Sequence, residues 1–126
     1  MKSETKNDPN LFVENHNHVI SLVINIKNKT YFFPDMRKQE KGYYRELYYN
    51  DLVTKIKEQY PSDIETIALK EDNSIIHMIK KSHYIFICEC SDKVSVSQIK
   101  MEFNEFADEF QKQGKYKKFF SSIFDW

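Results

Sequence analysis

Two segments of this chain are apolar at nearly every position, and they constrain the fold more than any other feature. They are Val19–Ile26 (VISLVINI) and Tyr84–Cys90 (YIFICEC). Both are short and rich in β-branched or aromatic residues, as β-strands are. A strand with one face in water alternates apolar and polar residues, so a strand without alternation has both faces covered. We therefore expect these strands side by side in the middle of a sheet that carries helices on both faces.

Polar turns bound three further predicted strands. Thr30–Phe33 follows the turn Lys27-Asn28-Lys29, in which Asn28 tolerates a left-handed backbone. Ile64–Lys70 and Ile75–Ile79 precede the second apolar segment, and short polar connections join all three into an antiparallel meander. Thr30–Phe33 and Ile64–Lys70 are the more polar strands, so we place them at the edges of the sheet.

Three helices are predicted from apolar residues spaced three or four apart. The first covers Tyr43–Tyr60 and ends at Pro61, and its apolar stripe consists of Tyr44, Leu47, Tyr48, Leu52, Ile56 and Tyr60. In the second, Ser95 and Gln98 have capping-box spacing, and its apolar stripe consists of Val96, Ile99, Phe103, Phe106 and Phe110. Gly114 ends this helix, and a third helix is predicted over Tyr116–Trp126.

The predicted fold is therefore α+β: a five-stranded antiparallel sheet with helices on both faces, in the order ββαβββαα. The length of 126 residues fits one domain. We assign residues 16–126 to this domain and residues 1–15, which are mostly polar, to a flexible N-terminal extension.

The charge balance and the apolar runs exclude several classes of protein. Nineteen basic residues balance nineteen acidic ones, and no nucleic-acid-binding motif occurs, so nucleic acid is not an expected partner. The chain has neither the apolar stretch of a signal peptide nor one long enough to span a bilayer. Cys88 and Cys90 point to one face of a strand and are expected to be buried, reduced thiols. A cytoplasmic location follows from these observations, with a membrane surface as one place of action.

The sequence predicts no catalytic residues, no metal ligands and no cofactor. His16 and His18 lack a neighbouring carboxylate or cysteine that would complete a metal site. The pair Ser82 and His83 lacks a glycine elbow, and a thiol such as Cys88 in an apolar strand is expected to be inert. Two isolated glycines cannot form a phosphate-binding loop. We therefore expect a protein that is not an enzyme.

The segment Ser74-Ile-Ile-His-Met-Ile-Lys-Lys-Ser-His-Tyr-Ile-Phe-Ile-Cys-Glu-Cys90, with the helix that continues to Phe110, resembles the longin-like domains of membrane-trafficking proteins and the small adaptor subunits of vesicle coats. The likeness rests on element order and apolar pattern, and covers residues 17–125. It implies another protein as the partner: a trafficking subunit, a SNARE-like segment or a small GTPase. A homodimer and a heterodimer are both compatible with it. Unlike longin domains, the chain has about fifteen polar residues before its first predicted strand.

The related roadblock fold, a dimeric platform for small GTPases, is the alternative. That fold usually opens with a helix, and we predict no helix before His18. A small-ligand-sensing α+β domain is a further alternative, because fold does not fix function.

Two surfaces are candidates for partner contact. In longin domains the groove between the first helix and the third strand receives peptide segments, and by resemblance this implies partner-binding roles for Tyr48, Tyr49, Leu52 and Ile67. The first helix also has five tyrosines, more than one packed face requires. The second surface, a peripheral membrane contact at most, would use Lys112, Lys115, Lys117 and Lys118. The expected function is a non-enzymatic protein-interaction module of a membrane-trafficking or small-GTPase-regulating assembly.

Overall fold

The computed structural model describes residues 8–34, 42–70 and 73–112, without the side chains of residues 64–67. Its elements are, in chain order, α2 (Pro9–Asn15), β1 (Val19–Ile26), β2 (Lys29–Phe33), α3 (Gly42–Gln59), β3 (Ile64–Lys70), β4 (Ser74–Lys81), β5 (Tyr84–Ser91) and α4 (Val96–Lys112). The third helix predicted over 116–126 lies outside the described residues, as do Lys115, Lys117 and Lys118.

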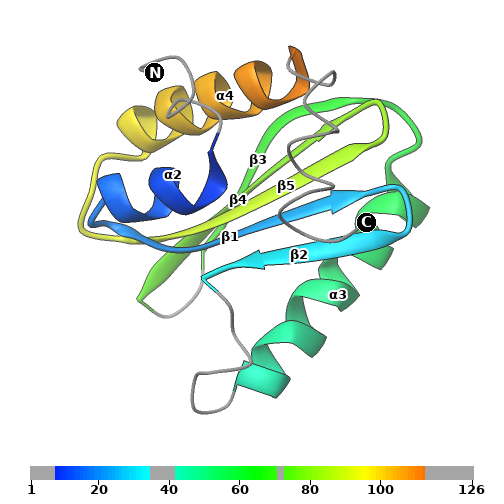
Figure 1. The fold of residues 1–126 in the computed structure, drawn as a ribbon, viewed down its shortest axis with the longest axis horizontal. Helices are drawn as coiled ribbons and strands as arrows, with labels where there is room; N and C mark the ends of the chain where they lie inside the picture. Colours follow the sequence, from blue (N-terminus) through cyan, green and yellow to red (C-terminus); the bar gives the residue numbers. More distant parts are fainter. Residues whose placement is uncertain (1–7, 35–41, 71–72, 113–126) are drawn as a thin grey trace.

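The strands form one antiparallel sheet in the order β2-β1-β5-β4-β3 (Figure 1). β1 and β5 are neighbours in the middle of it, where Leu22 pairs with Cys88 and Ile24 with Phe86. β2 and β3 are the edge strands. The predicted α+β sheet and the positions of all five strands are therefore confirmed.

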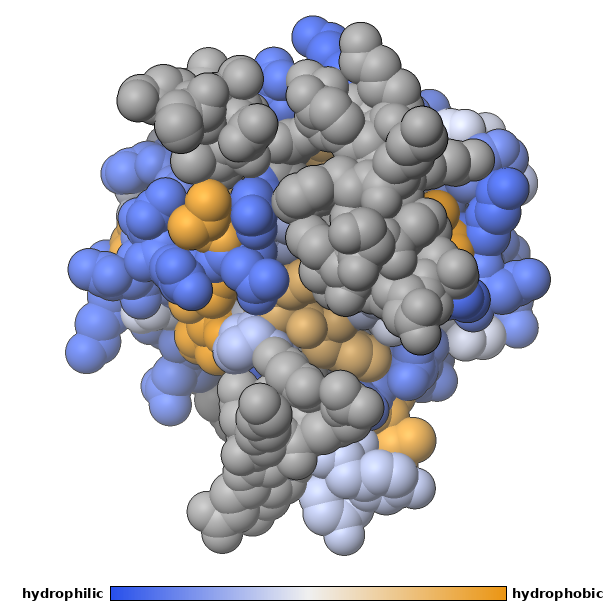
Figure 2. All heavy atoms as spheres, viewed as in Figure 1, coloured by the Kyte–Doolittle hydropathy of each residue, from blue (hydrophilic) through white to orange (hydrophobic). Residues whose placement is uncertain are grey.

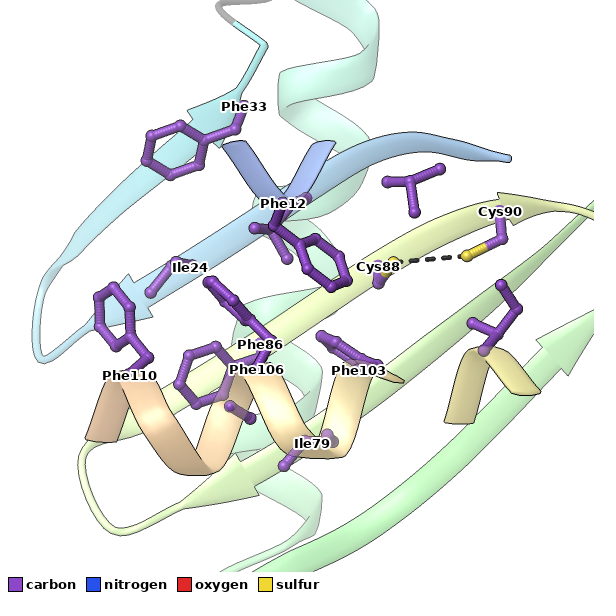
Figure 3. Packing of buried hydrophobic residues seen from close by; sticks show 14 residues of the cluster. Phe12, Ile24, Phe33, Ile79, Phe86, Cys88, Cys90, Phe103, Phe106 and Phe110 are labelled. Atoms are coloured by element: carbon purple, nitrogen blue, oxygen red, sulfur yellow. Dashed lines mark hydrogen bonds between the residues drawn. The ribbon is translucent and has the colours of Figure 1, made fainter. Parts of the chain in front are cut away.

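One face of the sheet is covered by α2 and α4 together. Phe103, Phe106 and Phe110 of α4 point toward the sheet beside Phe12 of α2 (Figure 3). The rings of Phe86 on β5 and Phe110 are 5.6 Å apart. This aromatic layer explains why β5 is apolar on the side that faces α4.

Among the described elements, α3 covers the opposite face of the sheet (Figure 1). The helix buries Tyr49, Val53 and Ile56 against β1, β4 and β5. Tyr44 and Leu47, which lie on the stripe that predicted this helix, are 69% and 48% exposed. The predicted helix is confirmed, but its buried side includes Tyr49, which was not on the predicted stripe. Tyr49 faces the sheet because polar groups on the sheet hold its hydroxyl.

Helix α2 corrects the predicted N-terminal boundary. We assigned residues 1–15 to a flexible extension, but Pro9–Asn15 form a helix. Oδ1 of Asp8 accepts hydrogen bonds from the backbone amides of Asn10 and Leu11, at 2.9 and 3.3 Å, and therefore caps the helix. Phe12 is buried, with its ring 4.7 Å from that of Phe106. Residues 9–15 thus belong to the domain.

The β1–β2 turn differs in detail from the prediction. Lys27, and not Asn28, has the left-handed backbone, with φ 58°. Asn25 supports this turn, because its side-chain amide donates to the Lys29 carbonyl at 3.1 Å and to the Thr30 hydroxyl at 2.8 Å. These hydrogen bonds explain why a polar residue is buried in an otherwise apolar strand.

Apolar atoms are visible along the middle of the molecule in Figure 2, with mainly hydrophilic atoms around them. None of the described helices has the length and apolar character that a bilayer crossing requires. At the start of α4, the backbone amide of Gln98 donates to the Ser95 hydroxyl at 3.4 Å, which is one half of the predicted capping box.

The first prediction concerns helix α2. Phe12→Ala should lower the free energy of unfolding by about 3 kcal/mol, because it leaves a cavity between α2 and α4. Urea denaturation followed by circular dichroism would measure the change. Glu14→Ala, at an exposed position of the same helix, is the control and should change stability little. Equal stability of both variants would show that α2 does not dock.

The second prediction concerns His77 on β4, which is 1% exposed. Within the described residues neither of its ring nitrogens has a hydrogen-bond partner. Burial, and then the positive charge of Lys100, lower the pKa of His77 from its ordinary value of 6.5. Below pH 6.5 the unfolded chain therefore binds a proton that the folded chain does not. The part of the stability that depends on neutral His77 is complete above that pH and is lost as the pH falls.

His77→Leu should reduce the loss of stability on going from pH 7 to pH 5 by up to about 1.4 kcal/mol per pH unit. Urea unfolding at a series of pH values would measure the difference, which isolates His77 from the other three histidines of the chain. Parallel pH profiles of the two proteins would contradict this account.

Candidate functional site

Large apolar side chains are exposed on the N-terminal half of α3. Tyr43 and Tyr44 are each 69% exposed, Leu47 is 48% exposed and Tyr48 is 39% exposed. We call these four residues the α3 patch. Tyrosine is a common contact residue in protein interfaces because it has a large surface and few torsions to fix. The α3 patch therefore has the composition of a protein-binding surface.

A hollow of about 350 Å³ adjoins the α3 patch through Tyr48. It lies where α3 crosses the end of β5 and the starts of β1 and β4, and it is lined by Ile20, Arg45, Tyr48, Asn73, Ser74, Ile76 and Glu89. The register of β1 against β5 shifts between Val19 and Ser21. Such a bulge changes the direction of a side chain, and Ile20 is 45% exposed although both neighbouring residues are buried.

Glu89 of β5 lies at the base of this hollow and accepts hydrogen bonds from three side chains. Its Oε1 accepts from Arg45 Nη2 at 2.6 Å and from the Tyr49 hydroxyl, and its Oε2 accepts from the Ser74 hydroxyl at 2.7 Å. The Tyr49 oxygen in turn accepts from Ser21 at 2.7 Å and from Arg45 at 3.0 Å. We call these five residues the Glu89 cluster.

The Glu89 cluster contains a partly buried ion pair whose charges are held by hydrogen bonds. Burial would raise the pKa of Glu89, but the hydrogen bonds from Tyr49 and Ser74 and the charge of Arg45 outweigh burial and hold this pKa below its ordinary value. Burial, and then the hydrogen bond to Glu89, raise the pKa of Tyr49. Burial would lower the pKa of Arg45, yet the negative charges beside it raise this pKa.

These shifts indicate what the cluster can do. A carboxylate whose pKa is lowered is a weak base, and a phenol whose pKa is raised is a weak acid, so neither group is suited to proton transfer near neutral pH. The cluster instead presents a fixed positive and a fixed negative group to the hollow. That arrangement is suited to recognition by charge and hydrogen bonding.

The four residues predicted to bind a partner lie in different environments. Tyr48 is part of the α3 patch and lines the hollow. Tyr49 is fully buried in the Glu89 cluster, so the direct contact predicted for it needs correction. Leu52 is partly buried against the core. Ile67 pairs with Met78 along edge strand β3, and its side chain lies outside the described residues.

Sequence reasoning missed Arg45, Ser74 and Glu89. Two signals pointed to them. Glu89 is a single carboxylate between two cysteines of an apolar strand, and a charge at such a position requires a partner. Arg45 and Tyr49 are four residues apart on a helix, so their side chains lie on one face.

His16 and His18 lie near a carboxylate that their sequence neighbourhood did not reveal. Oε1 of Glu102 on α4 is 3.6 Å from Nε2 of His16 and 3.3 Å from Nε2 of His18. These contacts connect the start of β1 to α4. In the described ranges no group of three or more His, Cys, Asp or Glu side chains is arranged to hold a metal ion.

The remaining candidates from the sequence are part of the core or of a turn. Cys88 and Cys90 are free and buried, on one strand face as predicted, with their sulfur atoms 3.4 Å apart. The hydrogen bond to Cys90 and burial raise the pKa of Cys88, which makes its thiol unreactive. His77 pairs with Cys88 across the sheet.

Comparison with known proteins gives no relatives from which a function could be transferred. No protein-family model matches the sequence, and no curated protein matches it. The site therefore has to be interpreted from its own geometry.

The third prediction tests the Glu89 cluster. Tyr49→Phe should lower the free energy of unfolding by about 1–3 kcal/mol, because it removes a buried donor to Glu89. A carboxylate with a lowered pKa stabilises the fold fully above its ordinary value of 4.5, and this contribution is lost as the pH falls below that value. Because the Tyr49→Phe variant is less stable before acid is added, it should unfold at a higher pH than the wild type as the pH falls.

Acid titration of both proteins followed by tyrosine fluorescence or circular dichroism would measure this shift. Tyr44→Phe, which removes a hydroxyl from an exposed ring, is the matched control and should behave like the wild type. If Tyr49→Phe also unfolds at the wild-type pH, the hydroxyl does not support Glu89.

Proposed function

We propose that this protein is a non-enzymatic interaction module of an assembly that serves membrane trafficking or regulates small GTPases, and that it acts in the cytoplasm. The observation that carries this proposal is the α3 patch, four large apolar side chains exposed together on one helix. Exposed apolar residues gathered in one area are a feature of protein-binding surfaces. The element order that suggested a longin-like domain gives the proposal its cellular context.

Helix α2 supports the roadblock-type alternative within the same proposal. A helix before the first strand is usual in the roadblock fold. The sequence made that fold the alternative because it predicted no such helix. Pro9–Asn15 supply one, on the same sheet face as α4. We therefore favour a dimeric platform for a small GTPase over a monomeric longin-like adaptor.

The fourth prediction separates these readings. Size-exclusion chromatography with light scattering should give twice the chain mass for the roadblock-type platform and the mass of one chain for the longin-like adaptor. Leu47→Asp places a charge in the α3 patch and should weaken partner capture from native lysate at least about tenfold, because a buried unpaired charge is costly at an interface.

Met101→Asp is the control for this experiment. Met101 is 65% exposed on α4, on the opposite sheet face, and its substitution should leave partner capture unchanged. Mass spectrometry of the captured proteins should identify a small GTPase or a trafficking subunit. Loss of capture in both variants, or in neither, would contradict a role of the α3 patch.

A further inference from the structure

The Glu89 cluster leaves hydrogen-bonding capacity unused, and two of its members, Arg45 and Glu89, line the hollow. Within the described residues the hydrogen bonds of Arg45 all involve Nη2, so its other guanidinium nitrogens have donors to spare. The Arg45 side chain is 35% exposed. Oε2 of Glu89 accepts one hydrogen bond, from Ser74, and a carboxylate oxygen can accept two. The hollow thus offers donors and one acceptor position next to each other.

The paired charges restrict what can use these groups. Arg45 and Glu89 are 2.6 Å apart. A carboxylate that approached Arg45 would therefore be repelled by Glu89, and an ammonium group that approached Glu89 would be repelled by Arg45. A neutral group that both accepts and donates meets neither penalty. The primary carboxamide of asparagine or glutamine has this character, with an oxygen acceptor and two N–H donors on one planar group.

The walls of the hollow suit the rest of such a residue. Ile20 and Tyr48 are partly exposed at its rim, and Ile76 is fully buried beneath it. A volume of about 350 Å³ is at the small end for ligand pockets, so one or two side chains would fill it. The hollow is also continuous with the α3 patch through Tyr48, which favours a residue of a partner protein over a free small molecule.

We propose that the hollow binds the carboxamide of an asparagine or glutamine from a partner protein, with an adjacent apolar side chain against Ile20 and Tyr48. The carboxamide oxygen accepts from Arg45, and its NH₂ group donates to Oε2 of Glu89. This inference rests on the proposed function, because it specifies how one point of the partner is recognised.

The fifth prediction tests this specificity with three capped dipeptides, N-acetyl-Leu-Gln, N-acetyl-Leu-Glu and N-acetyl-Leu-Lys, each as the methylamide. Titration of the ¹⁵N-labelled full chain by NMR should give chemical-shift changes at Ile20, Ser74 and Glu89. The glutamine peptide should bind about tenfold more tightly than the other two, since each of those places a like charge beside one member of the ion pair. Equal binding of all three, tighter binding of a charged peptide, or no binding would each overturn the proposal.

Two variants locate the effect. Arg45→Lys keeps the positive charge beside Glu89 but removes the planar fork, and should weaken the glutamine peptide about tenfold. Ile20→Ser should weaken all three peptides equally, because it removes apolar contact only. Met101→Ser, an exposed apolar position on the other sheet face, is the control and should bind like the wild type.

The amide inference and the proposed function fail separately. If partner capture depends on Leu47 but the three peptides bind equally, the proposed interaction module stands and carboxamide recognition is overturned. Selective glutamine binding in a protein that captures no partner would retain the site and overturn the proposed function.

Discussion

The two central strands have no face that is left for water, and the rest of the structure depends on this constraint. β1 and β5 pair along their length, and most of their residues are buried. A sheet of this kind is stable only with a layer on each side. In the part of the chain that the structure describes, one face is closed by α4 with the short helix α2, and the other by α3. Among these described helices, two therefore lie on one face and one lies on the other.

Helix α3 is positioned on its face of the sheet by a polar contact within an apolar core. Glu89 is the only acidic residue of β5, and its charge is satisfied by Arg45 and Tyr49 of α3 together with Ser74 of β4. Breaking a buried ion pair is costly because one charge remains without a partner. The cluster thus fixes which side of α3 faces the sheet. As a consequence, Tyr43, Tyr44 and Leu47 remain on the outer side.

Much of the fold could be predicted because it follows from local pattern. The lack of alternation in Val19–Ile26 and Tyr84–Cys90 predicted that both strands lie in the middle of the sheet. The positions of the other strands followed from that prediction. Helix α2 was missed because its seven residues have only one buried phenylalanine, although Asp8 and Pro9 carried an N-terminal cap signal. The candidate site was harder to predict, because Arg45 and Glu89 are far apart in the sequence and meet only through packing.

The contact between Phe12 and Phe106 joins two residues that are separated by most of the chain. Contacts of such long sequence separation form only after a large loop has closed, which slows folding. During synthesis, β1 and β2 leave the ribosome long before α4 exists. At that stage the α4 side chains that complete the aromatic layer are still missing. This apolar side of the growing sheet therefore stays uncovered until α4 has been made, and cellular chaperones would meet the nascent protein at this surface.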